Sequence, residues 1–440
     1  MAGRKKFICL LLMAALLLSG CMRTVDQMYG IPKRSEDFKN LQSAIDGAMQ
    51  GHSFSAPLSG ENQQAVQMAD LNGDGQQEFL LFAKCDSERP LRIMIFRQVD
   101  DAYIHIQTIE SNGSAFDLVE YVQMDDSPGM ELVVGSQLAD QVLRSVTVYT
   151  FDDEMIPQLQ VSANYTKFLT VDLDGDNLTE LFVLHPGQSD TDNGVAAVYG
   201  MENGAIERSN EINMSQPADK LKRILVGKLH NGQSAVYAAS AVDETAIVTD
   251  VCAWVSDSLT NVSFLNESGT SVHTMRNYYV YADDVDNDGV VELPDLITMV
   301  PLEPTLSTDR HDLIRWYSMT SGGSEVDKCY TYHNFLGGWY LELDSSWASR
   351  LTVRSQGNYY ELFLWDPDFT EAEEVLTIFV LTGQNREEQG VAEQRFILHS
   401  TDTVTYAASL EDSAADYGIT RMKIEEAFHL IQQDWKTGET

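Results

Sequence analysis

The 440-residue sequence predicts a mainly β fold built from repeated four-stranded units. From residue 64 onward, similar units recur at intervals of about 50 residues, which is the scale of repeat architectures. Each unit has an acidic or polar turn followed by short apolar strands. Hydrophobic residues make up 43% of the chain, enough to fill a large core. We therefore expect a β-propeller of about five or more four-stranded blades, followed by a small α+β C-terminal domain.

Residues 1–20 have the pattern of a signal peptide. A basic segment at residues 4–6 precedes the apolar run Phe7–Leu18, which is too short to span a bilayer comfortably. The run ends in Leu18-Ser19-Gly20-Cys21, which resembles the lipobox of bacterial lipoproteins. This resemblance implies lipidation at Cys21, a membrane anchor and an extracytoplasmic location on the bacterial envelope, with residues 21–34 as a tether. An ordinary signal peptide and a short buried helix are the alternatives.

Residues 35–51 are expected to form an amphipathic helix that packs against the following domain. Ser35 can act as the N-cap, and Gly51 can terminate the helix. The apolar residues with helical spacing form one face: Phe38, Leu41, Ile45, Ala48 and Met49.

The repeats extend over residues 64–334 in five units. The residues that begin the first strand of successive units are Glu78, Glu131, Glu180, Ser234 and Glu292. A pair of immunoglobulin-like sandwiches is the structural alternative, but it would not place a similar acidic loop at each repeat start. Residues 335–440 read as further strands closed by a helix that begins after Thr420 and extends to Trp435. They form either an α+β domain or additional blades, and their aromatic residues are expected in its core.

Three acidic loops predict calcium sites. The sequences DLNGDGQQE, DLDGDNLTE and DVDNDGVVE place oxygen-bearing residues at positions 1, 3, 5 and 9, with the main-chain carbonyl of position 7 directed at the same point. Calcium prefers six to eight such oxygen ligands. The predicted ligands are Asp70, Asn72, Asp74, Gln76 and Glu78 in the first loop, Asp172, Asp174, Asp176, Leu178 and Glu180 in the second, and Asp284, Asp286, Asp288, Val290 and Glu292 in the third.

Position 6 of each loop should have a positive φ angle. Gly75 and Gly289 occupy it in the first and third loops, and Asn177 occupies it in the second. Glycine adopts this conformation freely, and asparagine tolerates it best among the other residues.

These loops, followed by the runs EFLLF and ELFVL, resemble the FG-GAP/VCBS repeats of integrin-α-like propellers. The resemblance implies a loop that joins two strands of a blade and holds a structural calcium ion, with up to three sites in this chain. The second and fourth units lack the acidic pattern and are expected to hold none. An EF-hand would need an acid at position 12, where Leu81, Val183 and Asp295 stand, so only the third loop is ambiguous.

The formal net charge of −38 argues against nucleic acid as a partner. Cys85, Cys252 and Cys329 are far apart and have no metal-binding spacing, so free thiols are expected. The sequence contains no nucleophile elbow, HExxH motif or P-loop. We therefore expect a non-catalytic binding or scaffolding module with a protein or an envelope glycan as its partner. A hydrolase of envelope polymers, with its site in the propeller channel or the C-terminal domain, is the alternative.

Overall fold

The computed structural model describes residues 36–431, except 101, 139–142, 188, 190–191, 203–204, 279 and 304–310. The predicted signal peptide, the tether and the predicted lipidation site at Cys21 lie outside the described residues. No helix among the described residues is long and apolar enough to cross a membrane.

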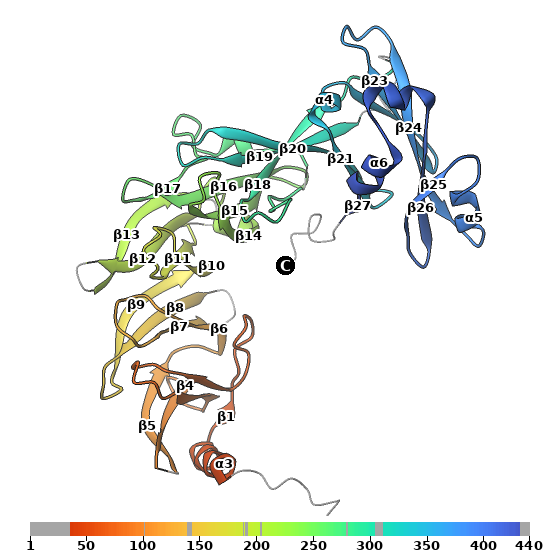
Figure 1. Cartoon of the computed structure of the whole chain (residues 1–440). Helices are drawn as coiled ribbons and strands as arrows, with labels where there is room; N and C mark the ends of the chain where they lie inside the picture. Colours follow the sequence, from red (N-terminus) through yellow and green to blue (C-terminus); the bar gives the residue numbers. More distant parts are fainter. Residues whose placement is uncertain are drawn as a thin grey trace, which may run out of the picture.

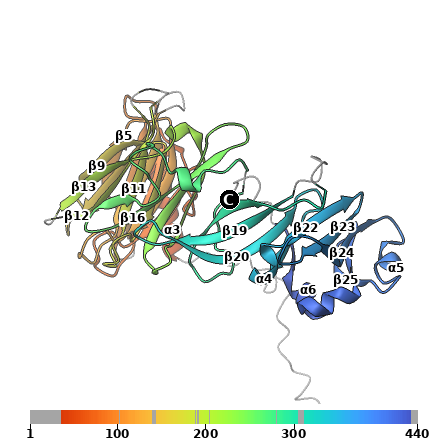
Figure 2. The ribbon, with the colours of Figure 1, turned by 90° about the horizontal axis from the view of Figure 1, so that it is seen from above.

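The described residues form six antiparallel sheets of four or five strands, so the mainly β prediction is confirmed. In five of the sheets, most strands pair with their neighbours in chain order, as in a propeller blade. Figure 1 shows the sheets following one another along an open arc, with the first sheet at the lower end and the sixth at the upper right. The view from above also places the sixth sheet far from the first (Figure 2).

The first sheet is covered at one side by helix α3 (Glu36–Ala48), in the region where the sequence predicted an amphipathic helix. Its strands are β1 (Ser53–Phe54), β2 (Val66–Ala69), β3 (Glu78–Lys84), β4 (Leu91–Val99) and β5 (Ala102–Ser111). Ile45 of α3 is buried in a cluster with Phe79, Leu81, Met94 and Phe96. The apolar face of the helix therefore docks on β3 and β4.

The next three sheets have four strands each. The second contains β6 (Ala115–Val122), β7 (Glu131–Gln137), β8 (Arg144–Phe151) and β9 (Pro157–Tyr165). The third contains β10 (Lys167–Val171), β11 (Glu180–His185), β12 (Val195–Glu202) and β13 (Ala205–Asn213). The fourth follows the 3-10 helix η2 (Ala218–Lys220) and contains β14 (Leu221–Lys228), β15 (Ser234–Ala241), β16 (Ile247–Trp254) and β17 (Leu259–Asn261). The second strand of each sheet is apolar and buried on both faces, because a sheet on each side covers it.

The fifth sheet follows the 3-10 helix η3 (Val272–Thr274) and contains β18 (Glu292–Thr298), β19 (Asp312–Met319), β20 (Glu325–Asn334), β21 (Trp339–Leu343) and β27 (Phe428–Leu430). Sheet pairing therefore continues past residue 334, where the sequence placed a domain boundary. The predicted C-terminal helix is shorter than expected. Thr420 caps α6 (Arg421–Ala427) as predicted, but Phe428 then enters β27, which pairs with β21.

The sixth sheet has the order β22-β23-β24-β26-β25 and lies within the residues predicted as a C-terminal domain. Its strands are β22 (Leu351–Gln356), β23 (Tyr359–Trp365), β24 (Ala372–Thr382), β25 (Phe396–Ser400) and β26 (Val404–Leu410). The accompanying helices are α4 (Ser345–Ala348), α5 (Arg386–Gly390) and the 3-10 helix η4 (Asp412–Tyr417). Trp339, Trp347 and Tyr360 are buried in one core cluster, as the sequence predicted for these aromatic residues.

The hydrophobic core is divided into clusters that lie between consecutive sheets. One cluster joins Phe82 of the first sheet to Val119 of the second, and another joins Val133 of the second to Val183 of the third. Similar clusters join the third sheet to the fourth, the fourth to the fifth and the fifth to the sixth. Each sheet is thus stabilised by its neighbours, as in repeat proteins. The three described cysteines are free thiols, as predicted.

Candidate metal centres at the acidic loops

The three acidic loops lie at the same edge of their sheets. The first connects β2 to β3, the second connects β10 to β11, and the third leads into β18. Each touches the neighbouring sheet through main-chain hydrogen bonds. The amide of Met130 donates to the carbonyl of Asp70 at 3.2 Å, and the amide of Thr179 donates to the carbonyl of Gln123 at 2.7 Å. At the third loop, the amide of Lys228 donates to the carbonyl of Gly289 at 3.0 Å. This edge therefore fastens consecutive sheets together.

A buried glutamate closes each loop from the first position of the following strand. One carboxylate oxygen accepts a hydrogen bond from the main-chain amide seven residues earlier. The pairs are Leu71 to Glu78 at 3.2 Å, Met124 to Glu131 at 2.7 Å, Leu173 to Glu180 at 2.8 Å and Val285 to Glu292 at 3.2 Å. The second unit keeps this bond although it lacks the acidic pattern. The glutamate is therefore part of the loop architecture, whether or not a metal binds.

The first aspartate of each loop holds the loop backbone in place. Asp70 accepts from the amides of Gly73 and Gly75 at 2.8 and 2.9 Å. Asp172 accepts from the amides at the same two positions, Gly175 and Asn177, at 2.7 and 3.1 Å. Asp284 accepts from the amides of Asp288 and Gly289 at 3.0 and 2.8 Å. At position 6, φ is +85° for Gly75, +71° for Asn177 and +86° for Gly289, which confirms the predicted conformation.

Two of the three loops gather their carboxylates closely enough to hold a metal ion. In the second loop, ligand oxygens of Asp172, Asp174 and Glu180 lie within 4.8 Å of one another. In the third loop, those of Asp284, Asp286 and Glu292 do the same. The remaining predicted ligands of these loops, Asp176, Leu178, Asp288 and Val290, belong to the same turns but not to these groups of three.

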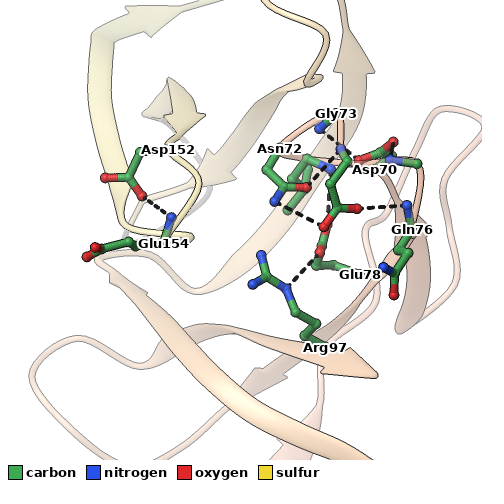
Figure 3. Close-up of polar contacts among 11 residues, drawn as sticks. Asp70, Asn72, Gly73, Gln76, Glu78, Arg97, Asp152 and Glu154 are labelled. Atoms are coloured by element: carbon green, nitrogen blue, oxygen red, sulfur yellow. Dashed lines mark hydrogen bonds and ion pairs between the residues drawn. The ribbon is translucent and has the colours of Figure 1, made fainter. Parts of the chain in front are cut away.

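The first loop does not form such a group among the described residues, although the same pattern predicted one. Asn72 stands at position 3 and donates to Asp74 at 3.4 Å, while Asp74 accepts from the amide of Gln76 at 2.8 Å. The second oxygen of Glu78 lies 3.3 Å from Nε of Arg97 (Figure 3). The sequence did not reveal this arginine as a partner, because it lies 19 residues away on β4.

Burial raises the pKa of carboxyl groups in the second and third loops. Burial, with a smaller effect from the neighbouring aspartates, raises the pKa of Glu180 to about 7. Burial likewise raises the pKa of Glu292 to about 7 and raises the pKa of Asp174. Ionised carboxylates this close repel one another, and a divalent cation would relieve the repulsion. The donor set consists of hard oxygens, so the second and third loops could hold an ion such as calcium.

A lysine already contacts the third loop. Nζ of Lys328 lies 2.6 Å from Oδ2 of Asp286 and 2.7 Å from Oδ2 of Asp288. Among the described residues, no lysine or arginine forms an ion pair with the four acids of the second loop. The three loops are therefore alike in sequence but differ in the cationic side chains that face them.

Comparison with known proteins identifies no family for this chain. No family model matches it, and no curated protein sequence matches it. Among solved structures, the exotype rhamnogalacturonan lyase YesX is matched at 12% identity with a TM-score of 0.30, over 74% of this chain and 65% of that one. The chain thus spans slightly less than two thirds of that enzyme's length.

Two further structures are matched at 9% identity and a TM-score of 0.30. A protein from Lactobacillus plantarum is matched over 73% of this chain and 86% of its own length. A Bacillus licheniformis rhamnogalacturonan lyase is matched over 71% of this chain and 90% of its own length.

Proposed function

We propose that this chain is a lipid-anchored, extracytoplasmic binding module of the bacterial envelope, with calcium stabilising its stacked sheets. The acidic loops support this proposal most directly, because they carry the main-chain hydrogen bonds between consecutive sheets. An ion bound at this edge would hold each loop in the conformation that meets its neighbour. The calcium role is the one that the FG-GAP/VCBS-like sequence pattern implies, and the anchor is the lipidated Cys21.

The partner is expected at the opposite edge of the sheets. Strand β7 begins at the loop edge with Glu131 and ends at the other edge with Gln137. A recess of about 270 Å³ lies at that far end, between the first and second sheets, and is lined by Ser136, Ser145 and Ser162. Ser136 is only 5% exposed. Among the described residues, none of the three hydroxyls has a hydrogen-bond partner.

A second recess, of about 490 Å³, lies at the same edge between the second and third sheets. Its lining includes the polar side chains of Arg144, Asn164, Tyr165 and Asp192. Serine hydroxyls and the asparagine amide can exchange hydrogen bonds with the hydroxyls of a sugar chain, whereas the buried hydroxyl of Tyr165 already donates to Asp117 at 2.5 Å. An envelope glycan is therefore the partner that we propose, bound without chemical change.

The binding proposal is tested by incubating the purified chain with isolated envelopes and with purified wall glycans. Retention on one of these, with no turnover on a panel of glycosides, esters and peptides, supports the proposal. Ser136→Val should weaken retention, whereas Ser324→Val, an exposed substitution in the turn between β19 and β20, should not. Turnover of a bound polymer would favour an envelope-polymer hydrolase instead.

The anchor and the calcium role have separate tests. Cys21→Ser should move the chain from the membrane fraction to the soluble fraction. Calcium should raise the melting temperature of chelator-treated protein, and Asp174→Ala should reduce that rise. An identical melting temperature with calcium and with chelator would contradict the calcium role but not the binding role.

A further inference from the structure

Lys328 sets the third acidic loop apart from the second. It lies on β20, 40 residues beyond Asp288 in the chain, and reaches back to the loop across the fifth sheet. Its ammonium bridges Asp286 and Asp288 at 2.6 and 2.7 Å. These are positions 3 and 5 of the loop, both of which are predicted calcium ligands. A side chain thus supplies positive charge where a metal ion would bind.

The lysine does not satisfy the whole cluster. Glu292 is fully buried, and its ligand oxygen lies within 4.8 Å of those of Asp284 and Asp286, close enough to share a metal ion. One of its carboxylate oxygens accepts from the amide of Val285. The other, Oε1, is buried without a hydrogen-bond partner among the described residues. Burying a carboxylate oxygen without a hydrogen-bond donor costs free energy. A bound cation would stabilise this oxygen, which Lys328 does not contact.

We propose that Lys328 is an internal competitor for the third loop and makes this loop a weaker cation site than the second. A divalent cation that binds between Asp284, Asp286 and Glu292 must first displace the ammonium from Asp286. The second loop holds its four acids without a basic partner among the described residues, so a cation enters it without this competition. The two loops then fill at different calcium concentrations despite their similar sequences.

The lysine is suited to displacement. Its side chain is 31% exposed, and the two aspartates that it bridges are 44% and 43% exposed. Exposed ion pairs are individually weak, and a lysine ammonium is a strongly hydrated charge on a flexible stem. Lys328 can therefore move into water when a metal arrives. Arg97, which faces the first loop from β4, differs because it pairs with the fully buried Glu78, and Glu78 belongs to no close group of acids among the described residues.

The inference is tested by measuring calcium binding at the third loop alone. Asp74→Ala and Asp174→Ala together remove key ligands of the first two loops, and equilibrium dialysis then reports the dissociation constant of the third. In this background, Lys328→Met should bind calcium roughly three- to tenfold more tightly. Lys328→Arg retains the charge and should stay near the parent. Lys222→Met is the control, because Lys222 is an exposed lysine of β14 that forms no ion pair with the described residues and, unlike Lys228, no main-chain hydrogen bond to the third loop.

A second readout is the melting temperature without metal. Lys328→Met should melt below Lys222→Met in chelator, and the rise of its melting temperature on adding calcium should be larger. This reading rests on the proposed cation role of the loops, and the two can fail separately. If Lys328→Met melts cooperatively but binds calcium no more tightly than the parent, the competition is disproved. If a chain with only the second loop intact binds no calcium, the calcium role itself is wrong.

Discussion

A single glutamate position connects the local sequence to the stacking of the sheets. Four strands begin with a buried glutamate that accepts a main-chain hydrogen bond from seven residues earlier. In the fourth sheet Ser234 stands there, and a tight turn replaces the loop, with the amide of Leu229 donating to the carbonyl of Gln233 at 2.8 Å. The glutamate therefore accompanies the long loop and not the calcium pattern, since Glu131 follows a long loop that lacks the calcium-binding acids.

Glu131 allows this role to be examined without a metal. Burial raises its pKa from 4.5 to about 7. Between these pH values the folded chain holds a proton that the unfolded chain has released, so the stability contributed by this residue falls as pH rises. Glutamine cannot ionise, so Glu131→Gln should be more stable than the parent by about 1–3 kcal/mol near pH 8 and little changed near pH 4.5.

The measurement is the urea midpoint of both proteins at the two pH values. Glu154→Gln changes an exposed carboxylate of the same sheet and serves as the control. A stability difference that is the same at both pH values would show that Glu131 does not titrate on unfolding in this window.

The residue scale also shows how far the sequence predicts the site. The positive φ angles at Gly75, Asn177 and Gly289 follow from local sequence alone, because glycine and asparagine favour that conformation. The convergence of acids in the second and third loops accompanies an acid at position 3, whereas the first loop has the same spacing with Asn72 at that position and forms no such group among the described residues. The contacts of Arg97 and Lys328 do not, because these residues come from other strands and their proximity depends on strand register.

At the scale of the element, helix α3 illustrates a prediction made from periodicity. Ile45 is 8% exposed and packs among Phe79, Leu81 and Met94 of the first sheet. The C-terminal helix illustrates the limit of periodicity, since Phe428 has the spacing of a helix face but lies in β27. There its ring stacks on Trp339 with centroids 5.7 Å apart. Pairing with β21 outweighs local helical preference at this position.

Truncation of Ile45 should release α3 from the first sheet. Ile45→Ala removes buried apolar volume, which costs about 2–4 kcal/mol in well-packed cores. We expect faster amide hydrogen exchange in α3 and β4, with the fifth and sixth sheets unchanged, because each sheet is held mainly by its neighbours. Gln42→Ala on the exposed face of the helix is the control. Equal effects of both substitutions would mean that α3 does not depend on this apolar contact.

At the scale of the whole molecule, the repeat pattern predicted four-stranded sheets but did not predict whether the first and last sheets meet in a closed ring. Core clusters join each sheet to the next, and the described residues of the first and sixth sheets share no cluster. Propeller closure depends on contacts between units that are far apart in sequence, and such contacts leave no local pattern. This is why the sequence predicted the units more fully than their arrangement.

The open arc has a consequence in solution that a closed ring would not share. A compact chain of the length of residues 36–431 should have a radius of gyration of about 21 Å. Because the first and sixth sheets lie at opposite ends of the arc, small-angle X-ray scattering from residues 36–431 should give a clearly larger value (Figure 1). The distribution of interatomic distances should also have an extended tail. A radius near 21 Å with a symmetric distribution would mean that the sheets close into a ring in solution, with the sixth sheet brought against the first.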